Sequence, residues 1–208
     1  LNFAAESIIP SENSASIFTV YNSSSLSTGL SLRIDTRDDP YSPTEGLLFN
    51  NSYAFNRKKI NGPVQFITPG LETNINLQRI LLSLDIFYAI FSKQVIALKL
   101  NGRELQGSFF EISDLFRLGG TNTLRGYRED QFLGSRVFWS NLEYRLLLAR
   151  RTYTYLFFDT GYYLVKANSA VKLSNQEDFN VGYGLGLSVE TSLGIIGVSF
   201  ALAKGDSF

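Results

Sequence analysis

The 208-residue chain contains no cysteine, no histidine and no methionine. Without cysteine it can form no disulfide, thiolate metal site or thiol nucleophile. Without histidine it lacks the commonest general base and zinc ligand, and a Ser–His–Asp triad is impossible. The 19 basic residues balance the 19 acidic ones, so no net charge favours nucleic acid as a partner. The sequence therefore predicts no metal, no cofactor and no nucleic-acid function.

Long apolar runs are also missing. A membrane-spanning helix requires about 20 mostly apolar residues, whereas the longest uncharged run, Asn13 to Leu32, is diluted by serine and asparagine. Aromatic residues, at 14%, and the 17 glycines are plentiful, and charged residues make up only 18%. This composition leaves one membrane option, an antiparallel β-barrel whose strands each carry an apolar face.

Apolar and polar residues alternate along most of the chain. From Phe179 to Glu190, six large apolar side chains at odd positions alternate with small or polar residues at even positions. A period of two predicts a strand. About eight strands are expected between Leu26 and Ala203, with a possible ninth in Leu1–Ile9. Between Leu71 and Leu81 the apolar positions change from odd to even, which predicts a bulge or a loop edge.

Short and long connections alternate between the predicted strands. Short turns are expected at residues 38–45, 91–94, 149–151 and 192–194, and long loops at 56–72, 105–134 and 165–178. This arrangement is typical of an outer-membrane barrel. A soluble barrel or sandwich is the alternative, with its apolar face turned inward. Bulky charged residues at strand centres, such as Lys99, Arg103 and Arg145, fit either arrangement, and the pattern and the loop lengths together favour a wet lumen with lipid outside.

The longest loop, residues 105–135, contains the string Leu-Arg-Gly-Tyr at 124–127, shortly after Gly119 and Gly120. This string resembles the signature of the BamA/TamA family, the bacterial surface antigen barrels that assemble other outer-membrane proteins. Three further segments, 35–46, 141–145 and 157–161, resemble family motifs in the same order. Together the matches extend over nearly the whole chain.

The resemblance implies that the loop folds back into the lumen and places Arg125 against the inner wall. The expected loop residues are Gly119, Gly120, Leu124, Arg125, Gly126 and Tyr127, and the expected wall partners are Glu143, Phe157, Asp159 and Gly161.

The two wall carboxylates can also be placed from the residues alone. A hairpin centred near Arg151 would set Glu143 directly across from Asp159. Two carboxylates so close favour a bridging cation, since one would otherwise tend to protonate, and Arg125 or Arg145 could supply it. Paired carboxylates are also used by glycosidases, but a lumen wall with a compensating arginine explains them better.

Family barrels have sixteen strands, and this sequence predicts about half that number. The resemblance therefore implies that residues 1–208 form the C-terminal half of a larger barrel, without a POTRA domain. It implies insertion or translocation of outer-membrane proteins in a Gram-negative-type outer membrane, rather than covalent catalysis. The implied partners are the lipid bilayer, client proteins and upstream periplasmic POTRA domains. A passive pore or structural barrel plugged by its loop is the alternative function.

Overall fold

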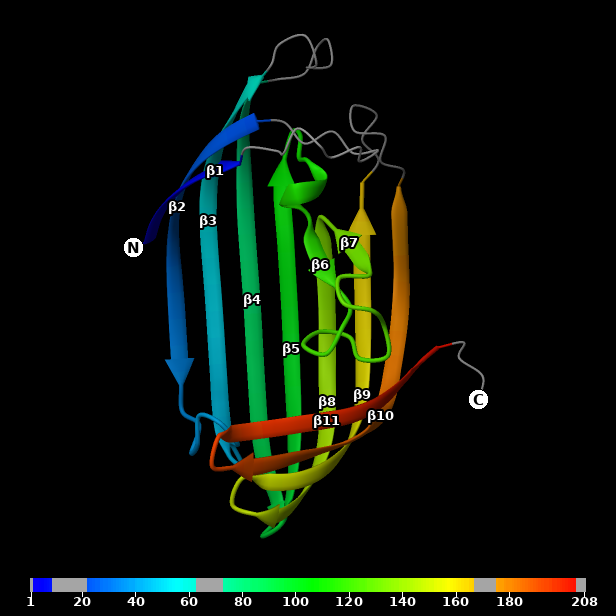
Figure 1. Cartoon of the computed structure of the whole chain (residues 1–208). Helices are drawn as coiled ribbons and strands as arrows, with labels where there is room; N and C mark the ends of the chain where they lie inside the picture. Colours follow the sequence, from blue (N-terminus) through cyan, green and yellow to red (C-terminus); the bar gives the residue numbers. More distant parts are fainter. Residues whose placement is uncertain (1, 9–21, 63–72, 167–174, 205–208) are drawn as a thin grey trace.

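A computed structural model describes residues 2–8, 22–62, 73–166 and 175–204 of the chain. Nine strands form one antiparallel sheet in the order β1-β2-β3-β4-β5-β8-β9-β10-β11, and two short strands, β6 and β7, form a separate hairpin (Figure 1). The bounds are β1 Asn2–Ile8, β2 Asn22–Asp35, β3 Gly46–Gly62, β4 Asn74–Phe91, β5 Gln94–Gly107, β6 Phe116–Leu118, β7 Phe132–Gly134, β8 Arg136–Ala149, β9 Thr152–Val165, β10 Gln176–Thr191 and β11 Gly194–Ala203. The predicted all-β antiparallel class is confirmed.

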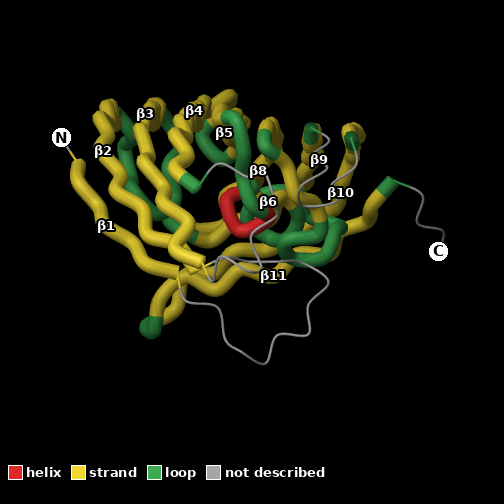
Figure 2. Tube along the Cα trace, turned by 90° about the horizontal axis from the view of Figure 1, so that it is seen from above, coloured by secondary structure: helices red, strands yellow, loops and turns green. Residues whose placement is uncertain are grey.

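The sheet is strongly curved, and its strands follow an arc around a central space (Figure 2). Within the described ranges, the outermost strands β1 and β11 each pair on one side only, so the sheet does not close on itself. β11 runs obliquely across the open side of the sheet near the short turns (Figures 1 and 2). The fold is therefore that of a partial barrel. In the part of the chain that the structure describes, no helix has the length and apolarity to cross a bilayer.

The outer face of the sheet is apolar. On β10, Leu185 and Leu187 are 54% and 43% exposed, whereas Asn180 and Ser188 of the opposite parity are buried. A soluble barrel would enclose these leucines in a dry core, whereas a membrane barrel turns them toward lipid. The predicted alternation on this strand is confirmed, and its direction fits a membrane barrel.

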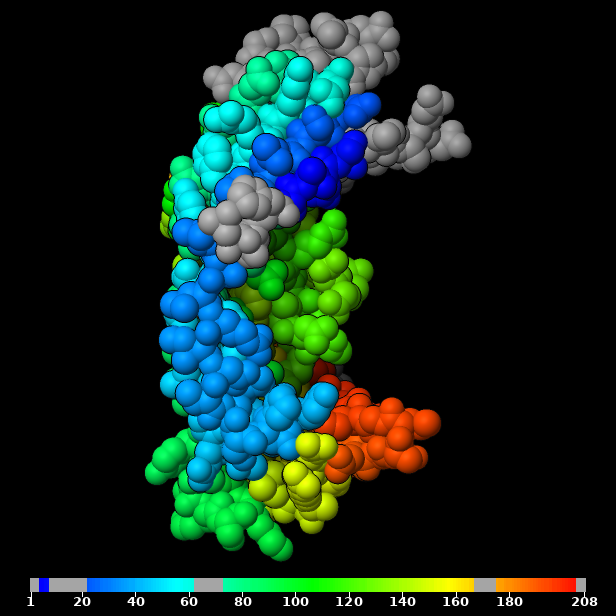
Figure 3. Space-filling model, turned by 90° about the vertical axis from the view of Figure 1, so that its left-hand side faces the viewer, coloured from blue at the N-terminus to red at the C-terminus, as the bar shows by residue number. Residues whose placement is uncertain are grey.

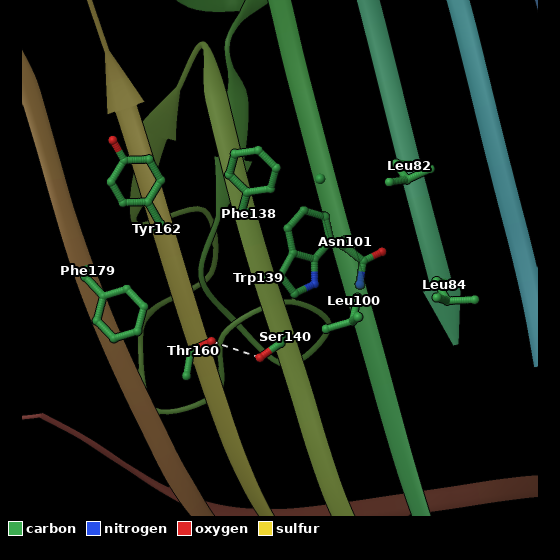
Figure 4. A pocket seen from close by; sticks show the side chains of 11 residues that line it. Leu82, Leu84, Leu100, Asn101, Phe138, Trp139, Ser140, Thr160, Tyr162 and Phe179 are labelled. Carbon is green, nitrogen blue, oxygen red and sulfur yellow. Dashed lines mark hydrogen bonds between the residues drawn. The ribbon is translucent and has the colours of Figure 1, made fainter. Parts of the chain in front are cut away.

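A shallow hollow of about 310 Å³ interrupts this apolar face where small side chains replace large ones (Figure 4). Phe138, Tyr162 and Phe179 border it, and the hydroxyls of Ser140 and Thr160 lie 2.8 Å apart in a mutual hydrogen bond. This hydrogen bond lowers the cost of turning the two hydroxyls toward hydrocarbon.

The core lies on the opposite, concave side, between the sheet and the segment that joins β5 to β8. Figure 3 shows this segment in green, between the N-terminal strands in blue and the C-terminal hairpin in orange. Buried apolar side chains from the segment pack on those of the wall, which include Ile60, Ile75, Leu77, Leu105, Val137 and Trp139. The apolar contact holds the segment against the wall without requiring a closed barrel.

The parity change in β4 has a different cause from the predicted one. β4 begins at Asn74, so a loop edge does lie within residues 71–81, but β4 then pairs with β3 in unbroken register to Phe87, so the predicted bulge is absent from the described part of that range. Ile75 and Leu77 point to the concave side and are buried, because the loop segment covers the wall there. The apolar positions change parity because the loop excludes water from the concave face of β4 at Ile75 and Leu77. The change does not mark a break in the strand.

The short turns lie where the sequence predicts them, at residues 36–45, 92–93, 150–151 and 192–193. The two other predicted long loops, 56–72 and 165–178, lie largely outside the described residues, although β3 continues to Gly62 and β10 begins at Gln176.

An ion-pair clasp joins two of the short turns to the end of β10. Arg151 donates to Asp39 at 2.8 and 2.9 Å and to Glu190 at 3.0 Å. The hydrogen bonds from Arg151 lower the pKa of Asp39 to about 2. The clasp therefore ties the β2–β3 turn to the C-terminal strands across the curved sheet.

Candidate functional site

The loop that joins β5 to β8 is anchored at its base by main-chain hydrogen bonds. Leu105 N–H donates to Ser135 O at 2.7 Å, and Ser135 N–H donates to Leu164 O at 2.8 Å. Between these anchors, β6 and β7 pair through Phe116↔Gly134 and Leu118↔Phe132. The hairpin, which the sequence did not predict, projects its tip along the inner face of β8 and β9 (Figure 1).

Gly119 and Gly120 form the bend at the tip of this hairpin. Their φ angles are +120° and +95°, a region that side chains with a Cβ rarely adopt. A Cβ on Gly119 would lie 2.5 Å from the carbonyl oxygen of Arg128. The hydroxyl of Thr123 lies 2.8 Å from both the main-chain nitrogen and the carbonyl oxygen of Gly119, and so fixes the bend. After the bend and the exposed residues Thr121 and Asn122, the chain returns to the wall at Leu124 and Arg125, which are buried.

Arg125 is joined to Asp159 of β9 by a bidentate contact. Its Nε donates to Oδ2 at 2.7 Å and its Nη2 donates to Oδ1 at 2.8 Å, and its main-chain N–H donates to Oδ2 at 3.1 Å. Both side chains are buried, and Asp159 is 0% exposed. Such a planar, charge-assisted pair is strong and directional.

Glu143 of β8 completes the cluster. The remaining guanidinium nitrogen of Arg125, Nη1, donates to Glu143 Oε1 at 2.7 Å. Arg145 contacts the other oxygen of Glu143, at 2.8 Å through Nη2 and 2.9 Å through Nε. Two arginines thus face two carboxylates, and the buried group has no net charge. A neutral, fully paired cluster avoids the cost of isolated buried ions.

The predicted direct pairing of Glu143 with Asp159 is wrong. Asp159 lies opposite Asn141, and Glu143 lies opposite Phe157, so the two carboxylates are diagonal neighbours. Ala149 pairs with Thr152 and Leu147 with Tyr153, so the turn is centred between residues 150 and 151, and the irregularity beside it places the centre of the ladder at residue 150, one residue before the predicted centre. The diagonal offset leaves room for the guanidinium between the carboxylates.

Two residues that the sequence did not single out contribute to the site. Asn141 donates from Nδ2 to the carbonyl oxygen of Thr123 at 2.7 Å, and Tyr155 presents its ring 5.7 Å from Arg125 Cζ. The predicted wall residue Phe157 lies closer, with its ring centre 3.8 Å from Arg125 Cζ. An aromatic face attracts a cation at this distance. The inward parity shared by residues 141, 155 and 157 was the signal available in the sequence.

Glycines on the wall and in the motif allow the loop to come this close. A Cβ on Gly161 would lie 3.0 Å from the side chain of Leu124, which is fully buried. A Cβ on Gly182 of β10 would lie 1.8 Å from the carbonyl oxygen of Arg125. Gly126, with a φ of +96°, packs against the main chain of Leu202 in β11.

Tyr127 extends the contact. Its hydroxyl donates to the carbonyl oxygen of Val181 at 3.1 Å. The four motif residues, 124 to 127, therefore contact three neighbouring strands, β9, β10 and β11, in addition to Glu143 on β8. Within the described ranges, no group of three acidic side chains has an arrangement suited to a metal ion. Chemically, the cluster is a charge-assisted anchor in which both carboxylates are occupied by arginine.

A curved antiparallel sheet with an apolar outer face and a loop held on its inner face defines an outer-membrane β-barrel. The comparison with protein families gives a match to the Omp85 superfamily domain over residues 10–207. The chain belongs to the Omp85 superfamily, and the predicted family membership is confirmed. The superfamily consists of outer-membrane barrels of protein insertion and translocation. The comparison with curated proteins gave no match.

Proposed function

We propose that this chain is the barrel part of a factor that inserts other proteins into, or translocates them across, a Gram-negative-type outer membrane. The observation that carries the proposal is the buried contact of Arg125 with Asp159 and Glu143. This contact holds the Leu-Arg-Gly-Tyr segment on the inner wall of a superfamily barrel. The proposed partners are the bilayer, client outer-membrane proteins and upstream periplasmic POTRA domains.

The position of the loop suggests how it acts. Gly126 packs on the main chain of Leu202, and Tyr127 bonds to Val181, so the loop supports β10 and β11 from inside. Within the described sheet, β11 pairs with β10 only, so its other edge has no neighbouring strand. An unpaired strand edge can template an incoming strand, and a bilayer thinned beside it would lower the cost of insertion. In this mechanism, the loop keeps the last strands in the shape that receives a client.

The experiment is client folding in proteoliposomes that contain the product of the full gene. A urea-denatured small outer-membrane barrel is the client, and its heat-resistant electrophoretic mobility reports folding. We expect Arg125→Ala to slow client folding at least about tenfold, a loss of ~1.4 kcal/mol. Arg117→Ala is the matched control, because Arg117 lies in the same loop but is exposed and pairs only at 3.4 Å with Asp130. Equal rates for the two variants would contradict the proposal.

A plugged passive pore is the second candidate, favoured by the apolar packing of the loop on the wall. The same proteoliposomes distinguish it. For a pore, Arg125→Ala would raise ion conductance and leave client folding unchanged.

A further inference from the structure

A second buried ion cluster lies at the root of the same loop, on the N-terminal side of the barrel wall. Lys58 of β3 is only 3% exposed, and its Nζ contacts Asp114 Oδ2 at 2.7 Å and a carboxylate oxygen of Glu111. Both carboxylates belong to the loop, at either end of a one-turn 3-10 helix, η2 (Ile112–Asp114). The contact therefore joins the wall to a loop segment 56 residues further along the chain.

Arg79 of the neighbouring strand β4 completes this cluster. Its Nη2 donates to the carbonyl oxygen of Asp114 at 3.2 Å and lies 3.9 Å from Asp114 Oδ1. Asp114 Oδ2 also accepts the main-chain N–H of Glu111 at 2.9 Å, so one carboxylate both closes the helical turn and binds the wall. Two cations again face two carboxylates, as in the cluster around Arg125.

Stability alone does not explain these charges. The loop root already buries Phe109, Phe110 and Leu115 against Ile60 and Leu77. A buried ion pair adds little stability over apolar residues of similar size, because desolvation offsets the attraction. What it can add is specificity, since a lysine in this position is satisfied by only one placement of the loop. The apolar contact holds the loop root against the wall, and the ion pairs of Lys58 determine the position of the root on the wall.

We propose that Lys58 is a positioning residue that anchors the loop root to β3 and β4, independently of the anchor that Arg125 forms on β8 and β9. The loop then braces the curved sheet at two places. Any movement of the N-terminal strands relative to β8–β11 must break one of the two clusters. The functional importance of this brace rests on the function proposed above, but the anchoring itself does not.

These 208 residues contain no cysteine, so an introduced thiol is the only labelling site within them, and any cysteine outside them is first replaced by serine. Leu115→Cys reports on the loop root and Leu124→Cys on the motif, and both positions are buried. Labelling by a maleimide is measured on the folded full-length protein in lipid. We expect Lys58→Met to speed labelling at position 115 at least about tenfold, because it leaves two buried carboxylates without their lysine. The labelling rate at position 124 should stay within about twofold of the rate in the Leu124→Cys protein that retains Lys58.

Matched variants distinguish a specific role of Lys58 in positioning the loop root from a general loss of stability. Lys59→Met changes the next, exposed lysine and should leave both labelling rates unchanged. Lys58→Arg keeps the charge and should restore most of the protection at position 115. Asp114→Asn should expose position 115 as Lys58→Met does, and the double variant should be no worse than the worse single one.

Two results would overturn the proposal. Unchanged labelling at position 115 in Lys58→Met would show that Lys58 is no anchor, and equal exposure of positions 115 and 124 would show that the two anchors are not independent. Labelling needs no client, so it is separable from the proposed function. If the labelling pattern is as expected while Arg125→Ala leaves client folding intact, the brace stands and the proposed function fails.

Discussion

Gly182→Ala tests the close approach of the loop by steric means, without changing any charge. The added Cβ would lie 1.8 Å from the carbonyl oxygen of Arg125, whereas ordinary contact begins near 3.4 Å. The loop and β10 must move apart by the difference. The Arg125–Asp159 hydrogen bonds are 2.7 and 2.8 Å long, and bonds stretched by more than an ångström are no longer effective. A single methyl group should therefore break the buried pair.

The size of the effect follows from the burial of Asp159, which is fully enclosed. Leaving a buried charge without its partner costs roughly 3–5 kcal/mol, which corresponds to opening of the loop that is more frequent by about two to three and a half orders of magnitude. Glu143 keeps Arg145, so the cost falls mainly on Asp159. The actual figure should lie at the lower end if water enters the lumen beside the pair.

The assay is amide hydrogen exchange of residues 119–127 in the folded protein, followed by mass spectrometry. Gly197→Ala is the matched control, because a Cβ at this strand glycine meets nothing within 4 Å. We expect fast exchange of the segment in Gly182→Ala and native protection in Gly197→Ala. The reasoning is refuted if the segment stays protected in Gly182→Ala, or if both variants lose protection equally.

Three further predictions concern other parts of the molecule. Arg125→Lys should keep only part of the loop protection that Arg125→Ala loses, because lysine retains the charge but not the bidentate fork; the same exchange assay checks this. The Asp39 carboxylate has a pKa of about 2 against an ordinary 3.8, so its stabilising pairing with Arg151 is present above about pH 4 and lost as the pH falls through 2. The thermal midpoint should fall more steeply over this range in the native protein than in Arg151→Gln, and parallel curves would contradict the clasp. Leu185→Arg should destabilise the barrel by about 2–4 kcal/mol in urea titrations in lipid vesicles, because the side chain faces hydrocarbon; an unchanged midpoint would place it elsewhere.

Alternation along the strands was sufficient to predict the sheet. The pattern is clean on β10, where one face contacts lipid and the other is polar or small. On β4 the parity of the apolar positions reverses, because Ile75 and Leu77 are buried under the loop while Asn74 and Asn76 on the other face are polar and exposed. Predicting which face of a strand contacts lipid from alternating apolar residues assumes that the lumen face is in contact with water. A change of parity in such a barrel can therefore indicate where the lumen is filled.

The candidate site was accessible from the sequence only in part. The family resemblance indicated Arg125 and its partners Asp159 and Glu143. The register of the β8–β9 hairpin could not be predicted, because it depends on an irregularity beside the turn at residues 150–151 that no residue type indicates. Lys58, Glu111 and Asp114 were also missed. Lys58 is more than 50 residues from Glu111 and Asp114, so no sequence pattern connects them. Each is typical of a surface charge, and only the folding of the loop onto β3 brings them together.

The central claim is that the pairing of Arg125 with Asp159 supports client assembly. A double-mutant cycle on the client-folding rate tests it most directly, with Arg125→Ala, Asp159→Asn and both changes together in the reconstituted full-length protein. If the residues act through their mutual contact, each single change slows folding and the double variant is no slower than the slower single one. Single effects that multiply in the double variant, or single variants that fold clients at the native rate, would contradict the account.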